Sequence, residues 1–388
     1  MRLMWEESNG QAGQGAARVT MPPSGQWPPS PPGPGQQPPS WGPQPPWGAP
    51  PQRGGNRVKW ILGGVALVVV IGLTVVATLL VTKEDAGVTA NTRTATAAPT
   101  SPTSVDPSEF ASADDDGPIE VITDEPTCAA WTPIGDTLAQ KAAQGWNDRD
   151  PSIPASEWTP TQRALYEDMA EAMRSAAEET VALVKRTPHR VVRELYEQSI
   201  AYWRAFADKV ASYKPENNHL ALVATSTSNA VNYICAAIFY GSAASRAPFV
   251  VPAAPPRNLP PINDPASIQR YGAPPLSTCR EWIATVDEFN AATAEWRTTD
   301  PNIPAAQWSP EQQAIYVRMT TVMQSNADRL QDLGLRSGNV VFDDFASLAA
   351  QYRRAFVQTF TTYQPADGYL ANAAGQLVAA NYEACNAK

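Results

Sequence analysis

The chain has 388 residues, 38 of them proline and four of them cysteine, and its formal net charge at pH 7 is −9. This length is typical of two or three domains. The negative charge is concentrated in residues 60–388, which hold 24 basic and 36 acidic groups. Such a balance argues against nucleic acid and against anionic lipid headgroups as partners.

The first 59 residues are expected to be a disordered, Pro-rich tail. Fourteen of the thirty residues from Pro22 to Pro51 are proline, and most of the others are Gly, Gln, Ser or Trp. Such a segment has too little apolar surface to offset its ordering entropy, and it favours polyproline II conformations. Residues 1–20 differ in composition, and translation from Met1 or from Met21 fits the sequence equally well.

Residues 60–82 are predicted to form one transmembrane helix. They contain 23 residues without a charge, which exceeds the ~20 that cross a bilayer core. The run is too long, and too far from the start, for a cleaved signal peptide. Three basic residues precede it, whereas Lys83 is followed at once by Glu84 and Asp85. The positive-inside rule therefore places the N-terminus in the cytoplasm and the C-terminus outside.

Residues 83–126 are expected to be a flexible, acidic linker. They are rich in Thr, Ala, Ser, Pro and Asp, a composition that holds a folded part away from the membrane. The acidic run Asp114–Asp116 lies within this segment. Because no EF-hand-like loop surrounds it, a solvated charge run is favoured over a Ca²⁺ site.

The C-terminal half is a tandem duplication. The segment Asp150–Gln162 (DPSIPASEWTPTQ) returns 150 residues later as Asp300–Gln312 (DPNIPAAQWSPEQ). The two copies are assigned to residues 127–240 and 278–388, with a semi-rigid Pro-rich spacer at 241–277. Whether the copies pack against each other is left open.

Each copy is predicted to form an antiparallel four-helix bundle, so the fold class is all-α. Apolar residues recur at helical spacing in four segments of each copy. The Asp-Pro-x-Ile-Pro segment ends the first helix, since each proline removes an amide donor and restricts the residue before it. The second helix opens at Thr159-Pro-Thr-Gln or Ser309-Pro-Glu-Gln, and both are predicted to be capping boxes. The third helix is rich in aromatic residues, and the fourth runs to the last cysteine of its copy.

Four cysteines bracket the two copies, Cys128 and Cys235 in the first and Cys279 and Cys385 in the second. Four cysteines allow three pairings. Duplication favours one bridge per copy, because the ends of the first and last helices of such a bundle lie at the same pole. Four unpaired buried thiols are the alternative. Their spacing does not fit a zinc site, and an extracytoplasmic location allows oxidation.

Trp158 and Trp308 stand directly before the second helix of each copy. A polar residue occupies the fourth helical position, so the usual hydrophobic staple is missing. We expect both indoles to be buried against the first helix, near Trp146 and Trp296. If they are exposed instead, they become a repeated ligand-contact site.

The sequence offers no catalytic constellation, and the protein is expected not to be an enzyme and to use no cofactor or metal. HExxH, GxSxG, Walker A and GxGxxG motifs are missing. His189 and His219 belong to the first copy alone, which is typical of surface residues. The adjacent pairs Glu178–Glu179 and Asp343–Asp344 point to different sides of a helix and suit solvation.

Arg204 and Arg354 are the polar residues best placed for a binding role, because both copies keep them beside an aromatic residue. A guanidinium there could recognise a carboxylate or phosphate. The alternative, which we favour, is an ion pair inside the bundle with stacking on the aromatic ring.

The N-terminal part resembles mycobacterial and related actinobacterial proline-rich, single-pass membrane proteins. The resemblance rests on the Trp-punctuated tail, the Asn56–Trp60 border, one span and an Ala/Thr/Pro-rich segment after it, and it covers residues 21–126. It implies a location in the inner membrane of the cell envelope and no particular chemistry.

The leading hypothesis is a membrane-anchored envelope protein of non-enzymatic type. Its outer bundles would bind a protein, cell-wall or lipid component. The first alternative is a sensor or scaffold that couples outer binding to cytoplasmic partners of the Pro-rich tail. The second is an enzyme or transport accessory that uses a cleft between the bundles.

Overall fold

The computed structural model describes residues 106–272 and 276–387. The expected Pro-rich tail (1–59), the expected membrane span (60–82) and residues 83–105 of the expected linker lie outside these ranges. Within the described ranges the chain consists of helices, turns and loops, with no strand. The predicted all-α class is confirmed for this part of the chain.

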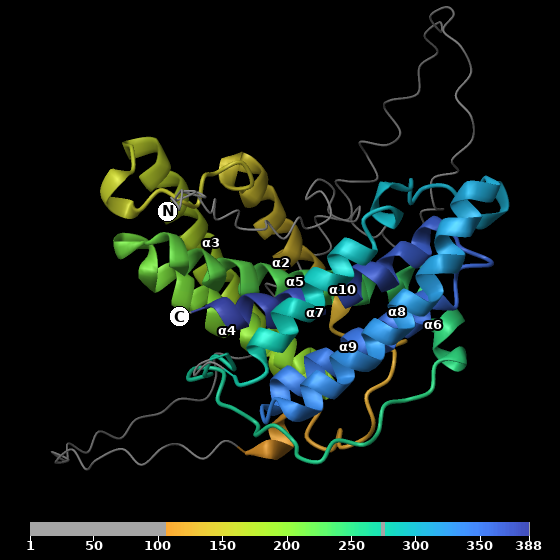
Figure 1. Ribbon diagram of the computed structural model, residues 1–388. Helices are drawn as coiled ribbons and strands as arrows, with labels where there is room; N and C mark the ends of the chain where they lie inside the picture. The colour runs from red at the N-terminus through yellow and green to blue at the C-terminus, as the bar shows by residue number, and fades with distance from the viewer. Residues whose placement is uncertain (1–105, 273–275, 388) are drawn as a thin grey trace, which may run out of the picture. The chain divides into compact units, whose positions relative to one another are not determined.

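Four helices form each copy, and neighbouring helices pack in chain order with the first returning to the fourth (Figure 1). Those of copy 1 are α2 (Cys128–Lys141), α3 (Pro160–Arg186), α4 (Arg190–Lys209) and α5 (Asn218–Phe239). Those of copy 2 are α7 (Cys279–Ala292), α8 (Pro310–Arg336), α9 (Val340–Val357) and α10 (Gly368–Asn386). A short helix, α6 (Ser242–Arg246), follows α5.

The first helices of the two copies differ by one residue. Cys128 and Trp146 are 18 residues apart, whereas Cys279 and Trp296 are 17 apart. Copy 1 takes up the extra residue in a π-turn at Ala142–Trp146, as helices accommodate local insertions. Gly145 within this turn has a φ of 107°, which a residue with a side chain rarely adopts.

The second helices begin where the sequence predicts. The amide of Gln162 donates to the Thr159 hydroxyl (3.2 Å), and the Gln162 side chain accepts from the Thr159 amide (2.9 Å). In copy 2 the Ser309 hydroxyl accepts from the Gln312 amide (3.2 Å). The complete capping box is therefore described in copy 1, and copy 2 has its serine arm.

Both disulfides join the cysteines that the duplication pairs. Cys128 is bonded to Cys235 and Cys279 to Cys385, with Cα atoms 5.6 and 5.3 Å apart. Each bond ties the start of the first helix of a copy to the last turns of its fourth helix, so each copy is closed on itself.

The two copies share one hydrophobic core. Among the described helices, α5 and α10 make the most extensive contact, and Figure 1 shows them crossing at the centre of the helical part. Val223, Ala224 and Val231 of α5 and Ala373 and Leu377 of α10 are completely buried. A second, smaller contact joins α4 to α9. The question that the sequence leaves open is settled: the copies pack together.

The contact between the copies is pseudo-symmetric. Equivalent positions in the third and fourth helices differ by 150 residues, so His219 corresponds to Tyr369 and Tyr233 to Glu383. His219 lies against Glu383, with Nδ1 2.7 Å from Oε2, and Tyr369 stacks on Tyr233. One contact is thus the mate of the other, as in an isologous interface.

The described end of the expected linker is a packed strap, which corrects the expectation of flexibility up to residue 126. Phe110, Ile119, Val121 and Ile122 are buried, and the Ala111 amide donates to the carbonyl of Lys185 (2.9 Å). Four apolar residues near helices offer enough surface to order a segment whose overall composition is polar.

The described residues of the spacer 241–277 also pack on both copies. The side chain of Gln198 donates to the carbonyl of Gln269 and accepts from the amide of Tyr271, both at 3.1 Å. Gly272 passes so close to the helices that a Cβ atom there would lie 2.8 Å from the carbonyl oxygen of Ala384. The spacer is therefore part of the interface between the copies.

One described helix is long and apolar enough to cross a membrane. It covers Pro215–Phe239, and 56% of its most apolar window is buried. Because α5 packs against α4 and α10, it is the central core helix of the folded part.

Candidate functional site

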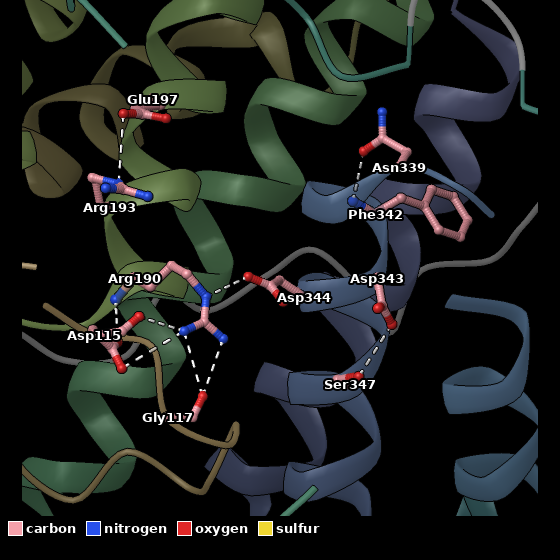
Figure 2. Close-up of polar contacts among 10 residues, drawn as sticks. All are labelled: Asp115, Gly117, Arg190, Arg193, Glu197, Asn339, Phe342, Asp343, Asp344 and Ser347. Carbon is pink, nitrogen blue, oxygen red and sulfur yellow. Dashed lines mark hydrogen bonds and ion pairs between the residues drawn. The ribbon is translucent and has the colours of Figure 1, made fainter. Parts of the chain in front are cut away.

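A buried cluster of charged side chains lies where α4 meets α9 (Figure 2). An interior with this much charge is unusual, because ionised groups lose hydration there unless they are paired. The cluster consists of five residues that are each at most 3% exposed: Arg190, Arg193, Glu194 and Glu197 of α4 and Asp344 of α9.

Arg190 connects three parts of the chain. Its Nε donates to Oδ2 of Asp344 (2.7 Å), and its Nη1 donates to the carbonyl oxygen of Asp115 (2.6 Å). Its backbone amide donates to the Asp115 carboxylate (2.6 Å). Figure 2 shows the guanidinium between the strap, with Asp115 and Gly117, and helix α9. Arg190 therefore fixes the strap and the second copy to the first.

Two expectations are corrected by this geometry. Asp115 was expected in a solvated charge run, yet it is bound to Arg190. Asp344 was expected to face solvent, yet it is 3% exposed and paired with Arg190. In both cases the partner lies far away in the sequence, so the residues next to each acid do not indicate the contact.

Glu194 and Asp344 occupy equivalent positions of the duplicated helix, and they interact across the interface. Burial, together with the charge of Asp344, raises the pKa of the Glu194 carboxyl well above its ordinary value. If Glu194 were ionised, neither of its carboxyl oxygens would have a donor. As a neutral acid it can donate to the Asp344 carboxylate, so we assign the protonated form to it.

Glu197 is the third buried carboxyl of α4. Burial raises its pKa to about 7, although the nearby Arg193 opposes this shift. The two side chains approach to 3.7 Å, and Glu197 also accepts from the Asn263 amide of the spacer (3.3 Å). The whole cluster is thus enclosed by α4, α9, the strap and the spacer, and it joins these parts.

Arg204 and Arg354 lie in matching ion pairs on the rim of each copy. Arg204 binds Glu178 (2.9 Å), and Arg354 binds Asp328 (2.7 Å), each 26 residues earlier in the chain. Arg204 also donates to the carbonyl of Pro265 in the spacer (2.7 Å). An ion pair is therefore present in each copy, but it lies on the rim, with a carboxylate that is 73% exposed, and not inside the bundle as expected.

Trp158 and Trp308 are buried, at 8% and 6% exposure. Each indole donates to the carbonyl of the isoleucine five residues earlier, at 2.9 and 2.7 Å. Their ring partners differ from those expected: Trp158 lies 4.0 Å from Tyr166, and Trp308 lies 3.9 Å from Tyr316. The tryptophans therefore pack on tyrosines of their own second helix. In copy 1 Trp146 contacts the same tyrosine, Tyr166, at 5.0 Å between ring centroids, so Trp158 does lie near Trp146.

The two histidines make contacts as well. The ring of His189 lies 2.7 Å from the carbonyl oxygen of Asp124. His219 is bound to Glu383 across the interface between the copies. Both side chains are partly exposed, in keeping with the expectation of surface residues, and each also connects segments that are distant in sequence.

Sequence reasoning missed Arg190, Glu194 and Arg193 as members of a site. A signal for one of them was present: an acid stands at the same place in both third helices, as Glu194 and Asp344. Charged residues on a core face indicate a buried polar contact.

Comparison with known proteins gives a family. A family model described as Mycobacterial ESX-1 associated protein matches residues 110–388. A protein of Mycolicibacterium smegmatis (strain MKD8), described as uncharacterized, is 46% identical over 337 residues, which cover 86% of this chain and 87% of the relative. No solved structure matches the chain.

Proposed function

The chain belongs to the mycobacterial ESX-1 associated protein family, and from this premise we propose that it is a membrane-anchored, extracytoplasmic protein that binds or stabilises part of the ESX-1 secretion system without catalysing a reaction. The folded part would stand outside the cytoplasm, held by the span expected at residues 60–82. The choice of the ESX-1 secretion system as the partner rests on the description of the family alone.

The observation that carries the proposal is the pair of disulfides. One intramolecular bond closes each copy, and such bonds form and persist in oxidising compartments rather than in the cytosol. A reducing intracellular location would leave four partly exposed thiols in place of the two bonds.

The arrangement of the charged groups supports a structural or binding role. Arg190, Asp344 and Asp115 engage one another inside the interface between the copies. Arg204 and Arg354 are engaged in ion pairs with their own second helices. These groups therefore hold the molecule together, which leaves its outer surfaces for a partner.

Two experiments test the proposal. A reporter fused after Lys388 that works only outside the cytoplasm should be active, and cytoplasmic activity of a second reporter at the same place would contradict the topology. Photo-crosslinking in cells from the exposed positions Val251 and Val317, at 81% and 72% exposure, should capture ESX-1 components. If the same proteins are captured in a strain without ESX-1, the proposed partner is wrong.

A further inference from the structure

The seam between the first and second helices differs between the two copies. In copy 2, three ion pairs bridge this seam: Glu281–Arg336 (2.7 Å), Glu288–Arg329 (2.6 Å) and Glu295–Arg318 (2.6 Å). The glutamates are spaced by seven residues, which places them on one side of the first helix and its extension. The surface of copy 2 is closed along the whole seam.

The space beneath this row of ion pairs is also filled. Arg353 is 6% exposed, lies over the ring of Phe289 at 4.1 Å and donates to Asn326. Burial lowers its pKa to about 9. A large guanidinium, a phenyl ring and an amide therefore pack together beneath the ion pairs, between α7 and α8.

Copy 1 carries the opposite set of residues at the same seam. Asp168 stands where copy 2 has Arg318, and Glu179 stands where copy 2 has Arg329. On the facing helix, Thr137 replaces Glu288. The two acids, with Glu171 between them, have no ion-pair partner among the described residues. The charge of one side of the seam is therefore reversed, and no ion pair neutralises these acids among the described residues.

An open groove follows from these changes. It has a volume of about 260 Å³ and lies between α2 and α3, with Leu138, Ala172 and Ala176 on its floor. These residues are smaller than Phe289, Val322 and Asn326, which stand at the same places in copy 2. Asp168, Glu171 and Glu179 line its rim on the α3 side, and Lys141 lines it on the α2 side.

We propose that this α2–α3 groove is a docking site for a basic amphipathic helix of a partner protein, a proposal that rests on the binding role proposed above. Charge complementarity selects the occupant: copy 2 shows that arginines satisfy acids across this seam, and copy 1 presents acids that lack them. The apolar floor would receive the apolar face of the helix, as in other helix-in-groove complexes.

The length of the rim sets the size of the occupant. Asp168 and Glu179 are 11 residues apart on one helix, which is roughly 16 Å or three turns. A helix of at least three turns, with Lys or Arg near both ends and apolar residues between, matches both acids at once.

The test is a binding measurement on the full-length protein in detergent. The probes are a labelled helical peptide of about 18 residues made of Leu and Lys, and its counterpart with Glu in place of Lys. Fluorescence anisotropy gives the Kd of each. The Lys peptide should bind and the Glu peptide should not.

The deciding variant closes the groove by rebuilding the ion pair of copy 2. Thr137→Glu with Glu179→Arg recreates Glu288–Arg329. It should weaken binding of the Lys peptide by about tenfold, since one acid is lost and the arginine in its place repels the peptide. Asp168→Asn with Glu179→Gln serves if the first variant is unstable. Glu167→Arg, an exposed change of α3 outside the groove, is the matched control and should change Kd by less than about twofold.

Equal weakening by Glu167→Arg would overturn the proposal, because binding would then follow the overall charge. Unchanged binding to the closed variant would overturn it as well. A crosslinker at Ser175 in the groove should capture a segment rich in Lys or Arg; capture of a second copy of this chain or of a lipid counts against it. Crosslinks to ESX-1 components from Val251 and Val317 are independent of these outcomes, so either proposal can fail alone.

Discussion

At the scale of single residues, Trp158 and Trp308 show how the duplication repeats one packing solution. Each indole is held by a hydrogen bond to the carbonyl of the isoleucine in the Asp-Pro-x-Ile-Pro segment, and each lies against a tyrosine of the following helix. Tyr213 and Tyr363 complete a cluster of three rings in each copy, with centroids 5.3 and 5.5 Å from the indoles. The proline-rich turn is thereby anchored to the second and third helices.

Trp158→Ala and Trp308→Ala should each lower the free energy of unfolding by roughly 3–5 kcal/mol, the usual cost of truncating a large buried side chain. Urea unfolding followed by circular dichroism measures this change. Val317→Ala, on the exposed side of α8, is the control and should cost less than about 0.5 kcal/mol. A loss below 1 kcal/mol for both tryptophans would mean that they do not stabilise the fold as described.

The ion pair between Arg190 and Asp344 allows a second prediction. Asp344→Leu leaves a buried guanidinium with part of its pairing, and Arg190→Met leaves a buried carboxylate, so each should cost about 3–5 kcal/mol. The double variant removes both charges and should cost clearly less than the sum of the two. Thermal or urea unfolding of the three variants tests this. An additive double variant would show that the two side chains do not interact.

The sequence predicts the residues that act within one copy and fails for those that act between copies. The cysteine pairs, the tryptophan burial and the Arg204 and Arg354 ion pairs depend on contacts inside a copy, which the duplication shows twice. Asp115 and Asp344 depend on Arg190, which lies elsewhere in the chain. Local pattern assigns such acids to solvent because nothing nearby offers them a partner.

At the scale of elements, α4 and α9 carry buried carboxyl groups that should make the stability of the fold depend on pH. Burial raises the pKa of Glu197 to about 7 and raises that of Glu194 well above its ordinary value. On α9, burial raises the pKa of Asp343 to about 6. The folded protein therefore binds these protons more tightly than the unfolded chain does.

The sign of the pH dependence follows from this difference. Stability is full below the ordinary carboxyl pKa of the unfolded chain, and it is lost as the pH rises through the raised pKa of each group. For Glu197 this window runs from about 4.5 to about 7, and Glu194 extends it upward. The free energy of unfolding should fall between pH 5 and pH 8, by up to about 3 kcal/mol from Glu197.

Urea unfolding at both pH values measures this effect. Glu197→Gln should flatten the profile, whereas Glu216→Gln, an exposed change, should leave it unchanged. A protein that is more stable at pH 8 than at pH 5 would contradict the assignment of neutral buried carboxyls.

The helices themselves could be predicted because their signals are local. Hydroxyl caps start the second helix and apolar periodicity marks the faces. The first helices end at Lys141 and Ala292, before the Asp-Pro-x-Ile-Pro segments that were expected to end them. The strap at 106–126 and the spacer at 241–277 could not be predicted in the same way. Their few apolar residues find a surface only after the two copies have come together, so composition alone indicates a linker.

At the scale of the whole molecule, the duplication produced one pseudo-symmetric body from two four-helix units. The same helices meet their own counterparts, α5 with α10 and α4 with α9. Such an interface puts equivalent side chains opposite each other, which explains why two acids, Glu194 and Asp344, meet in the interior. The two copies differ most clearly in the charged residues along the seam between their first and second helices, so their outer faces are different.

The two halves should therefore unfold as one unit. The contact between α5 and α10 is the most extensive among the described helices, and it buries residues such as Val223 and Leu377 completely. A separated half, such as residues 106–246 or 276–388, would expose this apolar face to water, at a cost of about 25 cal/mol for each Å². Neither half should fold alone at 25 °C, even with its disulfide formed.

Calorimetry decides this last prediction. The folded part should show one transition whose calorimetric and van't Hoff enthalpies agree, which is the mark of a single cooperative unit. Replacing Cys128 and Cys235 with Ser should lower the free energy of unfolding in that single transition by up to roughly 4–5 kcal/mol. The unfolded chain gains conformational entropy when the long loop is no longer closed. Replacing Cys279 and Cys385 should lower the same transition. Two separate transitions, each sensitive to its own cysteine pair, would instead mean that each copy is stable by itself. The α5–α10 contact would then join two bundles that fold independently.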